Sequence, residues 1–146
     1  MKANPKASRA GDVRLEPLNR YECWQLVTEA AGPTGVARVV WSGPEGPAIV
    51  PVNYTVADGF LWFQTAASSR VARECCDRQV LVEVDHVDAE AHTGWSVVLG
   101  GIARCQSSTD DRGLLGNSLL VWPEGLREVL FTVAPEELTG RRLGQG

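Results

Sequence analysis

The sequence contains no long hydrophobic run and no excess of positive charge. None of its apolar stretches approaches the roughly 20 residues of a membrane-spanning helix. Its 14 basic residues are outnumbered by 18 acidic ones, for a formal net charge of −4, which argues against a general binder of nucleic acid or of anionic membranes. The N-terminal stretch MKANPKASRAGDVR has no apolar segment of the kind found in secretory signals. We therefore expect a cytoplasmic protein with no nucleic-acid or membrane partner.

Cysteine and histidine are few, and their spacing fits no metal or redox motif. No C-x-x-C occurs among the four cysteines, and the adjacent pair Cys75 and Cys76 is a poor disulfide framework. We therefore predict four reduced thiols, as is usual in the cytoplasm. The two histidines, His86 and His92, lie across a polar stretch without zinc-like spacing. This favours a solvated loop, and no metal site is predicted.

Generic catalytic motifs are missing as well. The sequence has no G-x-S-x-G, no H-E-x-x-H and no phosphate-binding G-x-x-x-x-G-K-S/T. Its glycine-rich stretches are not surrounded by a βαβ unit, so they predict turns and a bulge rather than a dinucleotide site. No side chain is predicted to be catalytic. Any chemistry would need a reactive group borrowed from a cofactor.

The sequence does contain regularly spaced strand signals. Hydrophobic residues make up 44% and charged residues 22% of the chain, as in ordinary soluble domains. Helical spacing with Asn19 as a cap and Gly32 as a stop predicts one helix, and shorter helices are expected after Ser68 and over 108–120. Runs of β-branched and aromatic residues between turn signals predict six strands, over 35–41, 48–56, 60–65, 79–87, 94–105 and 128–135. We expect a mainly β domain in which one antiparallel sheet is closed or nearly closed.

Two strands carry residues that interrupt a regular ladder. Pro51 lacks an amide proton, so it predicts a sheet edge or a bulge within its strand. Gly100 and Gly101 predict a bulge or a close approach of backbones. Residues 1–13 are expected to be a disordered lead-in, residues 14–146 a single domain, and the stretch EELTGRRLGQG a polar tail.

One segment suggests a site for an anion. After the strand FLWFQT come Thr65, Ser69 and Arg70 at the start of a short helix. Hydroxyl groups, free amides at a helix start and a guanidinium can together hold a phosphate. A serine-capped helix with a surface arginine is the alternative, and it stays open. Asn53, in the middle of an apolar strand, also needs polar partners if it is buried.

The order of several stretches resembles that in the pyridoxamine 5′-phosphate oxidase-like flavoproteins. The stretches are YECWQLV, PVNYTV, FLWFQTAASSR, VEVDHVDAEAHTGWSVVLGGIA and PEELTGRRL. The resemblance spans about residues 14–143, and the small actinobacterial branch related to the nitroimidazole-resistance proteins is the most similar. It implies a six-stranded antiparallel split β-barrel with short covering helices, which binds FMN and works as a homodimer.

The resemblance also implies a binding site. The flavin ring would lie along residues 49–54, and its phosphate would be held after the next strand. Trp95 and Ser96 would lie near the cofactor or the dimer interface. Arg141 and Arg142 match a C-terminal motif of the family that would reach the partner subunit. The cofactor-binding residues implied are Ile49, Val50, Pro51, Val52, Asn53, Tyr54, Gln64, Thr65, Ser69, Arg70, Trp95 and Ser96.

We therefore expect an FMN-dependent oxidoreductase that acts on a small molecule, with a non-catalytic module for flavin, deazaflavin F420 or haem as the alternative. Val36 stands where relatives carry arginine, and Arg38 is displaced from that position. The sequence lacks the longer substrate-binding tail of true pyridoxamine phosphate oxidases, which argues against vitamin B6 phosphate as the substrate. The substrate and the electron donor are left open.

Overall fold

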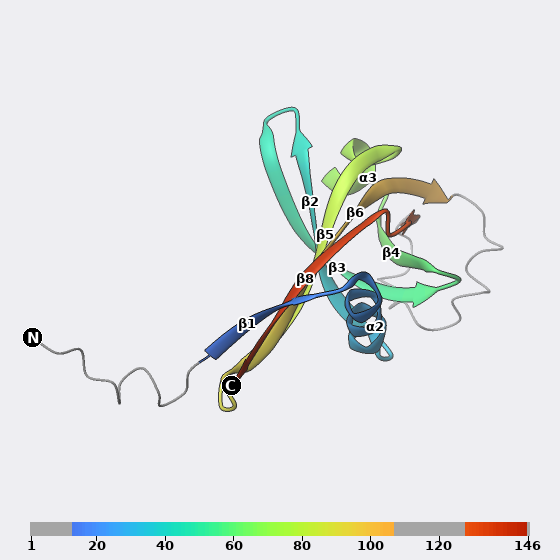
Figure 1. The fold of residues 1–146 in the computed structure, drawn as a ribbon. Helices are drawn as coiled ribbons and strands as arrows, with labels where there is room; N and C mark the ends of the chain where they lie inside the picture. Colours follow the sequence, from blue (N-terminus) through green and yellow to red (C-terminus); the bar gives the residue numbers. More distant parts are fainter. Residues whose placement is uncertain (1–12, 107–127, 146) are drawn as a thin grey trace, which may run out of the picture.

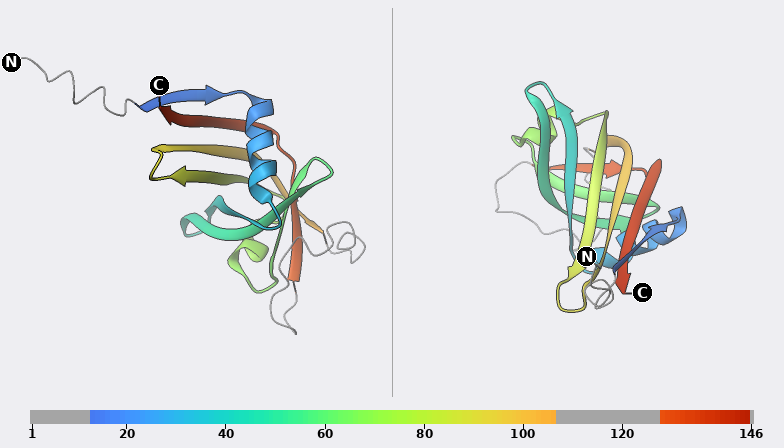
Figure 2. Two further views of the ribbon diagram at one scale, coloured as in Figure 1. Left: turned by 90° about the horizontal axis from the view of Figure 1, so that it is seen from below. Right: turned by 60° about the vertical axis from the view of Figure 1, so that its left-hand side comes forward.

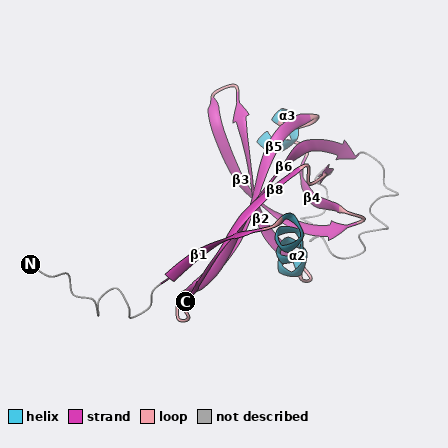
Figure 3. Cartoon of the chain, in the orientation of Figure 1, coloured by secondary structure: helices cyan, strands magenta, loops and turns pink. Residues whose placement is uncertain are grey.

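Strands make up most of the molecule (Figure 3). The structure is a computed structural model that describes residues 13–106 and 128–145 (Figure 1). The strands are β1 (Val13–Leu18), β2 (Gly35–Gly43), β3 (Gly46–Ala57), β4 (Phe60–Ala66), β5 (Arg78–Asp88), β6 (Thr93–Gln106), β7 (Glu128–Val133) and β8 (Glu137–Gln145). The helices are α2 (Arg20–Ala31) and α3 (Arg70–Glu74). The helix predicted over 108–120 lies outside the described residues, as does the expected lead-in up to residue 12.

Six of the strands close into a ring. They follow one another in the order β6, β5, β2, β3, β4, β7, and β7 pairs again with β6. β8 and β1 continue the sheet outside this ring, on the other side of β6 (Figure 2). The ring strands are the six predicted from the sequence. The antiparallel, six-stranded split barrel is thus confirmed, with two additional strands.

The ring is split along β6, which divides its length between two partners. Residues Gly94 to Gly100 pair with β8, and residues Ala103 to Gln106 pair with β7. The chain crosses from β7 to β8 beside Gly101, where an added Cβ atom would overlap the carbonyl oxygen of Ala134. Only glycine fits this approach, so the close contact of backbones predicted for this strand is confirmed.

The core lies inside the ring and follows from the alternation of side chains along each strand. In β2, Ala37, Val39 and Trp41 are buried, while Val36 and Arg38 point outward. Neighbouring strands contribute their own inward rows. The largest fully buried side chains in these rows are Tyr54, Leu61, Phe63, Leu99 and Phe131.

Helix α2 lies across the strands (Figure 2) and begins and ends where the sequence predicts. Asn19 Oδ1 accepts a hydrogen bond from Glu22 N at 2.8 Å, which forms a capping box, and the helix stops at Gly32. The helix is tied to the barrel by the buried Tyr54 hydroxyl, which donates to the carbonyl of Val27 at 2.7 Å. Among the described residues, no helix is long and apolar enough to cross a membrane.

The stretch expected to be a polar tail instead forms β8. Half-buried Leu138 and Gly140 alternate with exposed Thr139 and Arg141, so the strand buries only one face. An added Cβ at Gly140 would lie 2.8 Å from the carbonyl oxygen of Ser96, which shows how closely β8 follows β6. A strand with so few apolar residues has a weak sequence signal. β1 then pairs along β8.

The prediction of four reduced thiols is wrong for one pair. Cys76 and Cys105 form a disulfide, and their Cα atoms lie 5.5 Å apart, within the usual range for such bonds. The pairing of β5 with β6 causes this proximity, because Arg78 lies opposite Ala103. A separation of 29 residues hides this contact from the sequence. Cys23 and Cys75 are free and buried.

Candidate functional site

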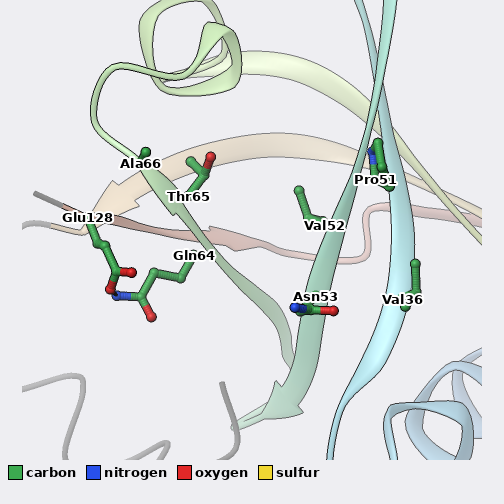
Figure 4. A pocket seen from close by; sticks show the side chains of 8 residues that line it. All are labelled: Val36, Pro51, Val52, Asn53, Gln64, Thr65, Ala66 and Glu128. Atoms are coloured by element: carbon green, nitrogen blue, oxygen red, sulfur yellow. Dashed lines mark hydrogen bonds between the residues drawn. The ribbon is translucent and has the colours of Figure 1, made fainter. Parts of the chain in front are cut away.

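A cavity opens where β3 and β4 separate. The two strands pair only between Tyr54–Ala57 and Phe60–Phe63. Beyond this point β4 keeps its pairing with β7, and β3 keeps its pairing with β2. The space between them measures about 450 Å³, a size typical of small-molecule and cofactor sites. Its lining is formed by Val36, Pro51, Val52, Asn53, Gln64, Thr65, Ala66 and Glu128 (Figure 4).

Pro51 lies at the free edge that borders this cavity. It pairs with Arg38 on the β2 side, and no β4 residue pairs with it on the other side. The predicted sheet edge is therefore present, at the place where β3 and β4 separate and the ring opens. Because the ladder stops here, backbone polar groups of β3 that face the opening can bind a ligand.

Five predicted cofactor residues meet in this cavity from two strands. Pro51, Val52 and Asn53 come from β3, and Gln64 and Thr65 come from β4. The side-chain amide of half-buried Asn53 forms no hydrogen bond to any residue that the structure describes, and its atoms remain accessible. The amide can therefore bind a polar ligand in the cavity.

The wall of the cavity that Glu128 forms was not predicted from the sequence. Gln64 Nε2 donates a hydrogen bond to the Glu128 carboxylate, so an acidic group lines the side of the cavity next to β7 (Figure 4). The pairing of Ala66 with Glu128 places it there. Nothing in the sequence connects residues so far apart. Val36 could have been found, since the short turn between strands 35–41 and 48–56 suggests a hairpin, and in the structure Val36 lies opposite Asn53.

The predicted phosphate-binding segment is only partly directed at the cavity. Thr65 lines it, and its hydroxyl donates to Ser69 Oγ at 2.9 Å. Ser69 Oγ also accepts from Ala72 N at 3.1 Å, which is the predicted serine cap of α3. Arg70 turns instead toward Glu74, with Nε at 2.7 Å from Oε2 and the guanidinium over Trp41, 5.7 Å from the ring centroid.

Charge and hydrogen bonding stabilise this arrangement behind the cavity. Glu74 accepts hydrogen bonds from Arg70 and from the Trp41 indole, and both lower the pKa of its carboxyl group. The hydrogen bond from Arg70 to Glu74 raises the pKa of the guanidinium in turn. Arg70 therefore keeps its positive charge, but its guanidinium is held against Glu74 and Trp41 and does not line the cavity.

The remaining predicted residues of β3 do not line the cavity with their side chains. Tyr54 is fully buried, its hydroxyl is held by Val27, and burial raises its pKa. Val50 packs against the core. Ile49 is 61% exposed on the outer face of the sheet.

The residues predicted on β6 and β8 lie on another part of the barrel. Trp95 is half-buried and lines a second cavity, which also contacts Val36. Ser96 lies opposite Asp85 on one side and Arg141 on the other. Arg141 and Arg142 are both exposed on β8.

A family model described as pyridoxamine 5′-phosphate oxidase matches residues 19–142, most of the chain. The chain belongs to this family. An uncharacterised protein of Mycobacterium tuberculosis is 30% identical over 97% of this chain and 91% of its own length.

Solved structures of family relatives have the same fold. A protein of Mycobacterium smegmatis described as FAD-binding is 29% identical, with a TM-score of 0.75 over 90% of this chain and 100% of that one. A second M. smegmatis protein, described as binding FAD and haem, is 14% identical, with a TM-score of 0.65 over 84% of this chain and 71% of that one. At that identity the second similarity is one of fold alone.

Proposed function

We propose that the cavity between β3 and β4 binds a flavin and that the protein is a flavin-dependent oxidoreductase acting on a small molecule. The observation that carries this proposal is the meeting of Pro51, Asn53, Gln64 and Thr65 in one cavity. The family resemblance assigns the first two residues to the flavin ring and the other two to its phosphate. The FAD-binding relative from M. smegmatis, similar over its whole length, adds support.

The lining suits a flat ring with polar edges. Val36, Pro51 and Val52 offer apolar contacts to its faces, and the Asn53 amide offers a donor and an acceptor to its edge. A bound flavin supplies the electron transfer, singly or as a hydride, that no side chain here can perform. The protein's part is to bind and orient the ring and to exclude water.

The phosphate would lie on the Thr65 side of the cavity. There the Thr65 and Ser69 hydroxyls share one hydrogen bond, which leaves one hydroxyl hydrogen for the phosphate. Arg70 follows Ser69 in the chain, with its guanidinium against Glu74 and Trp41. The Glu128 carboxylate lies opposite Ala66 in the β4–β7 ladder, so it points to the other face of β4 from Thr65, and there it would repel a phosphate. We therefore place the phosphate on the Thr65 face of β4, away from the Glu128 carboxylate.

FMN is the flavin that we propose, because the described residues beside the cavity include one segment suited to a phosphate, Thr65 to Arg70. FAD would have to place a second phosphate and an adenosine outside it. Since the M. smegmatis relative is described as binding FAD, the two flavins are compared directly in the experiments below.

We also propose a homodimer whose interface covers the outer face of the sheet beside the cavity. Ile49, Val40 and Leu81 form one cross-strand row there, and Ile49 and Leu81 are 61% and 42% exposed. Exposed Val36 and Pro51 continue the same face to the cavity, so a second copy would also shield the ligand. Sedimentation should show a dimer at micromolar concentration that Ile49→Asp weakens. A stable wild-type monomer would contradict this assembly.

The function is tested by purification followed by assay. The protein should carry or take up a flavin, identified by its absorbance and by chromatography after denaturation. Turnover is then measured with nicotinamide donors and with reduced F420. A bound flavin without turnover would favour the alternative, a flavin-binding carrier or sensor, and a protein that takes up no flavin would refute both.

A further inference from the structure

A second cavity opens where β2 and β5 separate. The two strands pair only between Arg38–Val40 and Leu81–Glu83. Past this short ladder, helix α2 and strand β6 close a space of about 380 Å³. Its lining is formed by Leu26, Glu29, Ala30, Val36, Val84, Asp85, His86 and Trp95. Val36 lines both cavities, so this space lies next to the proposed flavin site.

The aromatic wall of this cavity is Trp95. Its indole N–H donates to no residue that the structure describes, whereas Trp41 donates to Glu74 at 3.1 Å and Trp62 to the carbonyl of Ala57 at 2.8 Å. A half-buried indole beside an open space offers a flat surface for stacking and a spare donor. Val84, which is 2% exposed, forms an apolar floor.

The charge around the cavity is negative. Arg38 lies between Glu83 and Asp85, at 3.1 and 3.2 Å, so one cation faces two carboxylates. Burial and the neighbouring Asp85 raise the pKa of Glu83, as expected where acidic groups crowd together. Glu29 adds a third carboxylate on the opposite wall, and its side chain pairs with no cation in the described part of the chain.

We propose that this cavity binds a planar organic cation, stacked on Trp95 with its charge toward Glu29 and Asp85. An aromatic face attracts a cation through its quadrupole, and carboxylates on the rim attract it further. The same charges disfavour phosphates and carboxylates, so the flavin phosphate is kept out of this space. His86, beside Trp95 in the β5–β6 register, can hydrogen-bond to a polar substituent. The inference does not depend on flavin binding.

The test uses three ring compounds of nearly equal size and different charge. They are 1-methylnicotinamide, a cation, nicotinamide, which is neutral, and nicotinate, an anion. Each is titrated calorimetrically into the flavin-free full chain. We expect one cation per chain, bound at least tenfold more tightly than nicotinate. Equal affinities for the three compounds, or no binding of the cation, would overturn the proposal.

Variants locate the binding. Trp95→Leu should lower the affinity for the cation about fivefold or more, in line with the strength of cation–π contacts. Glu29→Gln should reduce the difference in affinity between 1-methylnicotinamide and nicotinate. Trp24→Leu is the matched control, because Trp24 lines a different surface cavity, with Tyr21 and Leu138. It should change the affinity less than twofold. If Trp95→Leu does not fold, Glu29→Gln decides alone, since that side chain is exposed. The proposed cation site would be refuted if Trp95→Leu and Trp24→Leu changed the cation affinity equally. It would also be refuted if Glu29→Gln left the affinity difference between cation and anion unchanged.

Discussion

Arg70 and Glu74 form an ion pair across one turn of α3, with Nε of the arginine 2.7 Å from Oε2 of the glutamate. The other carboxylate oxygen accepts the Trp41 indole N–H at 3.1 Å. The cation expected to grip a phosphate is therefore already held by a carboxylate and an aromatic ring. Only Nε takes part in this ion pair, and a guanidinium has further donors that can face an anion.

The first prediction concerns this cation. Arg70→Glu reverses the charge of the residue that follows Ser69 in the proposed phosphate-binding segment and adds a carboxylate beside Glu74. Losing a charged hydrogen bond costs roughly 1.5–3 kcal/mol, so FMN affinity should fall by about tenfold or more. Arg73→Glu on the same helix is the matched control and should change the affinity less than twofold. If both variants bind FMN like the wild type, Thr65 to Arg70 is an ordinary surface loop.

The second prediction follows from the lowered pKa of Glu74. A carboxyl group whose pKa is lower in the folded than in the unfolded state stabilises the fold above its unfolded pKa, about 4.3 for glutamate. That stabilisation is lost as the pH falls through the folded pKa. The free energy of unfolding, measured in urea, should thus differ between wild type and Glu74→Gln at pH 7. The difference should shrink towards pH 3, and a difference that is constant with pH would contradict the hydrogen-bond assignment.

A third prediction uses two adjacent glycines. Gly101→Ala places a Cβ against the backbone of Ala134, which cannot move without shifting the crossing from β7 to β8. Gly100→Ala meets its neighbours only at 3.4 Å or beyond, which is ordinary contact. Urea unfolding should show a loss of about 1–3 kcal/mol for Gly101→Ala and a much smaller change for Gly100→Ala. Equal stabilities would mean that the crossing is looser than it is in the structure.

The fourth prediction concerns the cysteines. With Cys76 joined to Cys105, denatured protein should titrate two thiols before reduction and four afterwards. Burial raises the pKa of Cys75 to about 11 and also raises that of Cys23. Both should therefore react slowly with a thiol reagent in the folded protein. Four thiols titrated without reduction would show that the pair is not bonded.

Local signals in the sequence were sufficient to predict the strands of the ring and helix α2. Its six strands were marked by β-branched runs and turn residues, and α2 by Asn19 and Gly32. β8 was missed because Leu138 and Leu143 are its only large apolar residues, too few to predict a strand. Its position depends on a tertiary contact with β6, which local propensity does not report.

The site could be predicted only where its residues lie on one strand or in one turn. Asn53 and Thr65, which both line the cavity, were predicted as site residues from such local patterns and from the family resemblance. Glu128 reaches the cavity through the pairing of β4 with β7, and His86 meets Trp95 through the pairing of β5 with β6. The side-chain conformation that directs Arg70 toward Glu74 cannot be predicted from the sequence. Contacts of this kind depend on register across distant strands.

Titration of flavin into the flavin-free protein tests the central claim most directly. FMN and FAD are added separately, and flavin fluorescence is followed for the wild type, for Ala66→Trp, which fills the cavity, and for Ala91→Trp on the exposed β5–β6 turn. We predict saturable binding of one flavin per chain, weakened about tenfold or more by Ala66→Trp and unchanged by Ala91→Trp. The absence of saturable binding of either flavin, or binding that Ala66→Trp leaves unchanged, would contradict a flavin site between β3 and β4.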